Sequence, residues 1–400
     1  MSTNKSQFLG GTLLIAGCCI GAAMLGLPII TGRSGFGPAI VAMIFAWLFM
    51  LATGLLLLEV NLSLGKQSGI ISMAEHTLGR LGKTLSWVFF LFLFYCLMVA
   101  YVAGSGSLIQ GIVKQAFNVS IPGWVGSLGA TALFGAMIVC GTSQVDTCNR
   151  YLMIGKGISY ILLLTLGFSA VDGELLAYHE WNASLAALPI LVVSFGYHNM
   201  VPSLTRYFNG NANVLKKVII VGSALPLLIY ALWEALVLGI IPVAGLEDAL
   251  GRGDTAAGAL QLQLGISRIA TIGQYFAFFA LATSFLAVAL SFVHFLGDGF
   301  KYGGTKKQDT LLTLAVLGPS FIFALMDPTI FLTALNYAGG IGAVILFGVM
   351  PALMAWNLRY RKKTSIKPIL PGGKVSLIIV MTIAVSILVL QILSSVGVNI

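Results

Sequence analysis

The sequence predicts an all-α integral membrane protein with about eleven transmembrane helices, and three observations support that fold class. The chain of 400 residues is 58% hydrophobic and only 9% charged, whereas soluble domains carry about 25% charged residues. Its apolar runs reach the ~20 residues that span the hydrocarbon core of a bilayer. Two of these runs are interrupted by glycine and polar residues. A soluble protein with an unusually large core is therefore a poor alternative.

Eleven apolar runs, bounded by charges, Pro or Gly, are the predicted spans. Backbone groups in lipid must bond within their own segment, so runs this long are expected to be helices. The first run is too long for a signal-peptide core and lacks a clear cleavage site, which predicts a retained span. The connecting loops are short, so residues 1–400 form one transmembrane domain. The predicted spans are 8–30, 36–64, 84–113, 123–141, 151–171, 186–207, 215–242, 267–297, 309–326, 328–357 and 374–396.

The distribution of Lys and Arg predicts the orientation, because cytoplasmic loops carry an excess of both. With the N-terminus inside, only Arg33, Lys114, Arg252 and Arg268 of the 22 basic residues fall on the outer side. Eleven spans then place the C-terminus outside. The net charge of +9 thus reflects membrane orientation and predicts no nucleic-acid partner. The cysteines avoid the predicted external loops, so no structural disulfide is expected.

The first and sixth spans are predicted to be broken helices. Gly17, Gly21 and Gly26 interrupt the first span before Pro28, and the polar segment 194–199 interrupts the sixth. Glycine loosens a helix and proline removes a donor. Such a segment at mid-membrane is expected where it lines a cavity. The alternative is that these glycines only permit close helix packing.

Two breaks that lie five spans apart predict two five-helix repeats, covering residues 8–171 and 186–357, with 374–396 as an extra helix. An odd number of spans inverts the second copy, and inverted repeats with discontinuous helices are typical of secondary transporters. Half-helix N-termini offer amides to a carboxylate. Unwound carbonyls accept hydrogen bonds from an ammonium group. This arrangement suits a free amino acid.

Six segments carry a resemblance that extends over nearly the whole chain. Together they resemble the hydroxy and aromatic amino acid permeases, the tyrosine- and tryptophan-specific bacterial transporters, with the tyrosine-specific branch nearest. This family belongs to the amino acid–polyamine–cation superfamily, which has the LeuT-type fold. The segments are IAGCCIGAAMLGLP at 15–28, LLLLEV at 55–60, GTSQVDTCNR at 141–150, SFGYHNMVPS at 194–203, ALATSFLAVALS at 280–291 and LNYAGGIGAV at 335–344.

The resemblance implies a LeuT-type 5+5 fold and proton-coupled uptake of an aromatic amino acid, with tyrosine the first choice, across a bacterial-type inner membrane. Tryptophan, a broader range of amino acids and sodium coupling are the alternatives. It implies no cofactor and no obligate protein partner. By the superfamily pattern, backbone amides hold the substrate carboxylate and backbone carbonyls hold its ammonium group. The amides are those of Gly21, Ala22 and Ala23, and the carbonyls lie near Cys18, Cys19, Val193 and Ser194.

Ala22 and Ala23 mark a departure, because some relatives in the superfamily have Ser or Gly at these two positions. Backbone contacts survive that change, whereas contacts from a side-chain hydroxyl do not.

Aromatic side chains near the breaks are candidates for recognition of the substrate ring. Phe195 and Tyr197 lie in the break of the sixth span, and Tyr101 lies in the middle of the third. Ring pairs favour offset or edge-to-face contact with an aromatic ligand. The alternative is that these rings only pack between helices.

Ionisable groups inside the predicted spans are candidates for coupling. Glu59 either titrates or binds a loop amide or a basic partner. His198 either exchanges a proton or stays neutral and satisfies unwound backbone groups. A structural hydrogen bond is expected for Glu234. Thr283 and Ser284 correspond to a sodium-binding pair of sodium-coupled members of the fold, and otherwise satisfy their own helix.

Asp146, Arg150 and Arg206 are predicted to form ion pairs of an inner gate. Other functional classes find less support. The sequence contains no complete phosphate-binding loop, no His-Glu-x-x-His zinc motif and no Gly-x-Ser-x-Gly elbow. A channel would need a selectivity filter or a ring of charges. The sequence therefore predicts a transporter without a catalytic or metal site.

Overall fold

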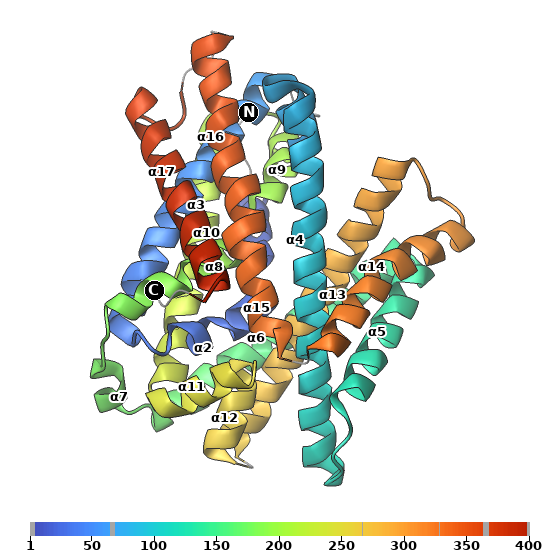
Figure 1. The fold of residues 1–400 in the computed structure, drawn as a ribbon, viewed down its shortest axis with the longest axis vertical. Coiled ribbons are helices and arrows are strands. Elements are labelled where there is room, and N and C mark those ends of the chain that lie inside the picture. Colours follow the sequence, from blue (N-terminus) through green and yellow to red (C-terminus); the bar gives the residue numbers. More distant parts are fainter. Residues whose placement is uncertain (1–4, 65–68, 266, 328, 363–367, 398–400) are drawn as a thin grey trace.

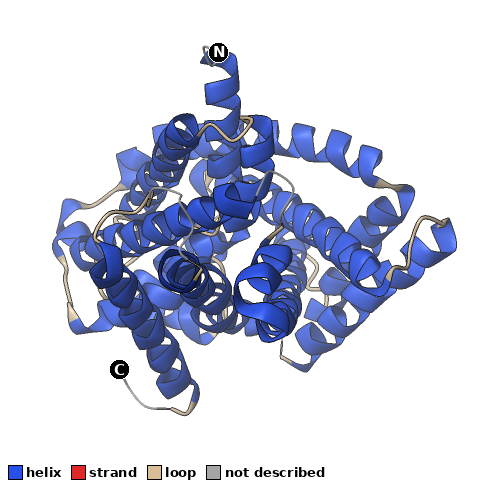
Figure 2. Ribbon diagram, turned by 90° about the horizontal axis from the view of Figure 1, so that it is seen from above, coloured by secondary structure: helices blue, strands red, loops and turns tan. Residues whose placement is uncertain are grey.

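A computed structural model describes residues 5–64, 69–265, 267–327, 329–362 and 368–397 of the chain. Within these residues the secondary structure is entirely helical (Figures 1 and 2). Ten helices are long and apolar enough to cross a membrane, and a bent helix pair at the N-terminus makes up to eleven. The all-helical membrane fold predicted from the sequence is confirmed.

The first five spans follow one another along the chain with short connections. The first consists of α1 (Lys5–Cys19), the 3-10 helix η1 (Ala22–Leu25) and α2 (Leu27–Thr31). The next four are α3 (Phe36–Leu64), α4 (Ile70–Phe117), α5 (Gly123–Cys140) and α6 (Thr142–Gly167). After η2 (Phe168–Ala170), α7 (Gly173–Ala177) and η3 (Asn182–Ala187) lead to the next set.

The sixth span consists of α8 (Leu188–Ser194), η4 (His198–Met200) and α9 (Val201–Tyr207). It is followed by α10 (Ala212–Leu238), the short helices α11 (Val243–Gly251) and α12 (Ala256–Leu264), α13 (Arg268–Phe300) and α14 (Lys306–Met326). One continuous helical run then contains α15 (Ile330–Tyr337), η5 (Ala338–Val349), α16 (Met350–Trp356) and η6 (Asn357–Arg361). The last span is α17 (Gly373–Ser395).

Two predicted boundaries were wrong, and both helices begin earlier than their apolar runs. Helix α4 begins at Ile70 instead of residue 84, with non-helical backbone at Gly79. Helix α6 begins at Thr142 instead of residue 151. The apolar run marks the part of a helix that suits lipid, whereas the helix itself continues through polar residues. Lys156 therefore lies about 20 Å along α6, at 1.5 Å per residue, instead of near the start of its span.

Both predicted helix breaks are present in the structure. The two halves of the first span meet at an angle of 49°, with Ile20 and Gly21 between α1 and η1. Phe195, Gly196 and Tyr197 separate α8 from η4 in the sixth span. Proline then restarts the helix in each case, at Pro28 in α2 and Pro202 in α9, where its missing N–H costs nothing.

The π-helical segment η5 supports α8, the first half of the sixth span. A π-helix is rare and usually marks a functional or strained position. A Cβ atom on Gly339 would overlap the Pro189 carbonyl oxygen, so only glycine permits this close backbone approach. The side chain of Gln391 on α17 packs closely against Gly340. The extra helix thus rests on the helix that positions the sixth span.

The two ends of the bundle carry different elements. In Figure 1 the N-terminus and the start of α4 lie at the upper end, and α7, α11 and α12 lie at the lower end. This arrangement agrees with the predicted separation of an inner side from an outer side. Lys66, Lys363 and Lys367, which count with the predicted inner side, lie outside the described residues.

Replacing Gly253 with Ala is expected to destabilise the lower end of the bundle. Gly253 has a φ of +64°, and a Cβ atom there would overlap the Thr329 carbonyl oxygen. A non-glycine residue in this conformation costs roughly 1–3 kcal/mol. The apparent melting temperature of the purified variant should fall by several degrees. Gly251→Ala is the matched control, because no atom lies near its added Cβ. Equal melting temperatures for both variants would contradict this packing.

Candidate functional site

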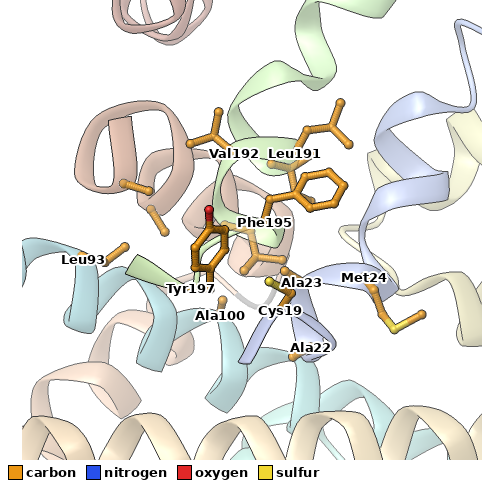
Figure 3. Close-up of a cluster of buried hydrophobic side chains, with 14 of the residues drawn as sticks. Cys19, Ala22, Ala23, Met24, Leu93, Ala100, Leu191, Val192, Phe195 and Tyr197 are labelled. Carbon is orange, nitrogen blue, oxygen red and sulfur yellow. The ribbon is translucent and has the colours of Figure 1, made fainter. Parts of the chain in front are cut away.

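The two helix breaks lie side by side in the core and bring together segments that are about 175 residues apart in sequence. The Cys18 Sγ atom donates to the Gly196 carbonyl oxygen and to Asn199 Oδ1, both at 3.5 Å. Figure 3 shows Cys19, Ala22 and Ala23 of the first break next to Phe195 and Tyr197 of the sixth. The pair of breaks, residues 18–23 and 193–199, is the candidate site.

The breaks are covered on one side and accessible from the other. Every residue of η1 and α2 is buried. Asn199 is exposed, and Cys18, Gly21 and Gly196 are half-buried. The covered side faces α11, because Gly32 packs against Leu246. The accessible side is the α9 side, which is the predicted inner side.

Helix α10 contacts the broken first span through two large side chains. The Tyr230 hydroxyl lies 2.6 Å from the Cys19 carbonyl oxygen and 2.9 Å from the Ser194 carbonyl oxygen. One turn further on, Trp233 Nε1 donates to the Met24 carbonyl oxygen at 2.8 Å. Both side chains are fully buried. The sequence analysis missed both residues, although their spacing of three places them on one helix face.

Lys156 of α6 reaches the first break from the opposite side. Its Nζ atom donates to the Ile20 carbonyl oxygen at 2.7 Å and contacts Thr283 Oγ1 at 3.4 Å. Lys156 is only 5% exposed. The sequence analysis placed it at the inner side, because the apolar run of α6 begins only at residue 151. A buried amine at the carbonyl of an interrupted helix can neutralise the partial negative charge there.

The hydroxyl pair on α13 also faces the first break. The Thr283 hydroxyl donates to the Phe279 carbonyl oxygen at 2.8 Å, so its oxygen can accept from Lys156. Ser284 Oγ accepts from the Ala22 amide at 2.9 Å. A Cβ atom on Gly21 would lie 2.8 Å from Ser284 Oγ, so this contact requires glycine. The two hydroxyls predicted as an ion site thus contact protein groups.

The backbone groups predicted to hold an amino acid lie together at the breaks. Of the three amides at Gly21, Ala22 and Ala23, the Ala22 amide is bonded to Ser284. Among the predicted carbonyls, Val193 accepts from the Gly196 amide at 3.0 Å. The carbonyl oxygens of Cys19 and Ser194 converge on the Tyr230 hydroxyl.

The three candidate aromatic residues occupy different surroundings. Phe195 packs edge-on against Tyr230, with ring centroids 5.3 Å apart. Tyr101 is buried in α4, and within the described part of the chain its hydroxyl has no hydrogen-bond partner. Tyr197 points to α3, where its hydroxyl donates to the Met50 carbonyl oxygen at 3.2 Å. Gly54 leaves the space for that hydroxyl.

His198 is held between two aromatic rings. Its ring stacks on Tyr197 at 4.9 Å and on Phe347 at 4.8 Å. His198 Nε2 lies 2.9 Å from Thr53 Oγ1, and over the described residues Nδ1 has no partner. A fully buried ring without a carboxylate beside it is typical of a neutral histidine. Its polar partner is a side chain instead of the backbone expected from the sequence.

Glu59 forms a buried ion pair and binds a loop amide as well. Both oxygens accept from Arg359, at 2.6 Å from Nε and 2.7 Å from Nη2. The Ile369 amide donates to Glu59 Oε2 at 2.8 Å. The two side chains are only 5% and 7% exposed. This pair links α3, η6 and the segment before α17.

The remaining polar candidates have local partners. Glu234 Oε2 lies 2.9 Å from the Thr31 hydroxyl, which is the structural hydrogen bond expected from the sequence. Asp146 pairs with Arg150 one turn away on α6, and both are exposed. Arg206 donates to Ser203 Oγ at 3.3 Å. The structure therefore does not bring Asp146 and Arg206 into an ion pair between helices.

These features define a multi-pass membrane protein with a site between two interrupted helices. Residues 4–391 match the model of the tryptophan/tyrosine permease family. The chain is 30% identical over 399 residues to Tyrosine-specific transport system 2 of Haemophilus influenzae, which covers 97% of each chain. It is 31% identical over 364 residues to the Tryptophan-specific transport protein of that organism, which covers 87% of each. The chain belongs to the tryptophan/tyrosine permease family and is a transport protein, not an enzyme.

Replacing Glu59 with Gln is expected to cost about 3–5 kcal/mol of unfolding free energy, because Arg359 is left as an unpaired buried charge. The variant that combines Glu59→Gln with Arg359→Met should recover much of that loss. Asp146→Asn, which removes an exposed pair, is the control and should have little effect. The stability of all three variants is measured by thermal unfolding in detergent. If the double variant is no more stable than Glu59→Gln alone, the unpaired charge of Arg359 does not cause the loss of stability.

Proposed function

We propose that this protein is a proton-driven symporter that imports an aromatic amino acid, with tyrosine as the first candidate substrate. Family membership and the names of the relatives support an aromatic substrate. Identity to the tyrosine-specific and the tryptophan-specific relative is nearly equal, so the choice between them depends on measured competition. The proposed fold is the LeuT-type 5+5 arrangement, with interrupted spans 1 and 6 as the first helices of two inverted repeats.

The contact between Lys156 and the Ile20 carbonyl is the observation that carries the proposal of proton coupling. A carbonyl exposed by a helix break in a membrane needs a donor or a cation. Lysine supplies both from a flexible stem, and its amine can exist in a charged and a neutral form. Protonation of the amine strengthens its hydrogen bond to the Ile20 carbonyl oxygen. Losing the proton weakens that bond.

The set of helices that contact the breaks supports the proposal of alternating access. Tyr230, Trp233 and Glu234 fasten the broken first span to α10. Lys156 and Ser284 contact the same span from α6 and α13. In the proposed cycle the bundle of spans 1, 2, 6 and 7 moves against spans 3, 4, 8 and 9. Ser284, on span 8, contacts the moving first span from the static part, and Lys156, on span 5, contacts it from a helix outside both sets. Protonation of Lys156 is thus proposed to be coupled to the movement of the first span.

The substrate is proposed to lie across the two breaks. Its carboxylate faces the amides of residues 21–23, its ammonium group faces the carbonyls of Cys19 and Ser194, and its ring lies near Phe195 and Tyr101. The free Tyr101 hydroxyl provides a polar partner inside the membrane, where an unpaired polar group is penalised. The protein is proposed to lie in an inner membrane. The excess of Lys and Arg on one side gives a cytoplasmic N-terminus and an external C-terminus.

Lys156 is a stronger candidate for the coupled proton than Glu59 or His198. Glu59 is held by Arg359 and a loop amide, and His198 is enclosed between two rings. Sodium coupling has less support, since Thr283 and Ser284 already contact Lys156 and the Ala22 amide.

Uptake of labelled tyrosine into proteoliposomes tests the function. A proton gradient alone should drive accumulation, tryptophan and phenylalanine should compete to a measurable degree, and leucine should not compete. Accumulation that requires a sodium gradient would reject proton coupling. No accumulation under either gradient would reject the proposed substrate.

Lys156→Met is expected to abolish proton-driven accumulation while tyrosine exchange across the membrane continues. Lys156→Arg should behave in the same way, because arginine stays protonated. Lys217→Met removes an exposed lysine and is the matched control, with unchanged accumulation. Accumulation and exchange are measured in the same proteoliposome preparation. A Lys156→Met variant that still accumulates tyrosine against its gradient would exclude Lys156 as the coupling group.

A further inference from the structure

We infer that Tyr230 is a positioning residue for substrate binding, and that its hydroxyl joins the two helix breaks where a bound metal cation would otherwise be required. The inference rests on the proposed function, because it concerns how the same site holds an amino acid. It assigns a role to a side chain on α10, outside both broken spans.

The geometry places one hydroxyl between two carbonyl oxygens from different spans. Tyr230 Oη lies 2.6 Å from the Cys19 carbonyl oxygen and 2.9 Å from the Ser194 carbonyl oxygen. Tyr230 is fully buried, as is Phe195, which packs edge-on against its ring. The hydroxyl is therefore fixed in place by its ring as well as by its hydrogen bonds.

Three oxygen atoms in this cluster share a single hydroxyl hydrogen, because a tyrosine hydroxyl is one donor. The shorter distance indicates that the hydrogen is directed mainly to Cys19. The Ser194 oxygen and the lone pairs of the hydroxyl remain able to accept further hydrogen bonds. A cluster rich in acceptors and poor in donors suits a cation, and the cation that an amino acid supplies is its ammonium group.

The hydroxyl also keeps the two breaks at a fixed separation. Carbonyls from two unwound segments repel one another unless a donor or a cation lies between them. A metal ion would bind there only reversibly, whereas a side chain is always present. Lys156 also donates to a carbonyl oxygen of the first break, that of Ile20, and its amine contacts Thr283 on α13. The donors at the first break are therefore side chains of the chain itself, and substrate binding requires no metal ion.

Tyr230→Phe tests the inference, because it removes one oxygen and preserves the ring. We expect the KM for tyrosine to rise about tenfold, or about 1.4 kcal/mol, with little change in the maximal uptake rate. Competition with 3-(4-hydroxyphenyl)propionate, which lacks the ammonium group, provides the specific readout. The variant should lose most of the preference for tyrosine over this analogue, whereas the wild type retains it.

Tyr160→Phe is the matched control. The Tyr160 hydroxyl donates to the Ile229 carbonyl oxygen at 2.6 Å, so the same substitution removes a similar bond next to Tyr230 without touching the breaks. This control should retain the wild-type KM and the wild-type preference. Equal behaviour of the two variants would overturn the inference. Failure of the wild type to transport tyrosine would instead reject the proposed function.

If Tyr230→Phe does not yield folded protein, 3,5-difluorotyrosine at position 230 provides a second test. This residue keeps the hydroxyl and nearly the same shape, and its hydroxyl is a stronger donor. The preference for tyrosine over the analogue should change at position 230 and stay constant for the same replacement at position 160. An unchanged preference at both positions would overturn the inference.

Discussion

The two helix breaks leave backbone carbonyl groups without helical hydrogen bonds in the middle of a bilayer. These carbonyls need donors from the protein, because lipid offers none. The arrangement of the other helices around the breaks follows from this requirement. Tyr230 supplies a donor between the Cys19 and Ser194 carbonyls, Trp233 supplies one to Met24, and Lys156 supplies one to Ile20. Helices α10 and α6 are thus held against the breaks by polar contacts as well as by packing. The resulting site is polar in its backbone and apolar in most of its side chains.

In the proposed cycle, the same contacts distinguish parts of the molecule that move separately. Tyr230 and Trp233 of α10 bond to the first span through groups that carry no charge, and these bonds persist when protonation changes. Lys156 contacts the first break through a group whose charge can change. The Glu59–Arg359 ion pair, at the end of α3 near the start of α4, is buried and held by an additional amide. It is better suited to fixing the segment before α17 than to carrying a proton across the membrane.

The span pattern, the two breaks and the family resemblance could be predicted from the sequence, because each depends on local composition. Glycine, proline and polar residues inside an apolar run indicate a break without any knowledge of tertiary structure. Lys156, Tyr230 and Trp233 could not be found in this way, since their partners lie tens or hundreds of residues away. Lys156 also lies deeper in its helix than the apolar run indicated, because α6 begins at Thr142 instead of residue 151. Glu59 was recognised from the sequence as an acid inside a span. Whether it titrates or forms an ion pair depends on Arg359, which is 300 residues further along the chain.

We propose that protein groups, instead of a bound metal ion, hold the two unwound segments in the form that binds substrate. Calorimetric titration of tyrosine into the purified protein, in sodium buffer and in choline buffer of equal ionic strength, tests it most directly. We expect the same affinity in both buffers, because Lys156 and Tyr230 already supply donors to the carbonyls of the breaks. An affinity that rises with sodium concentration would contradict it and would assign Thr283 and Ser284 to an ion site.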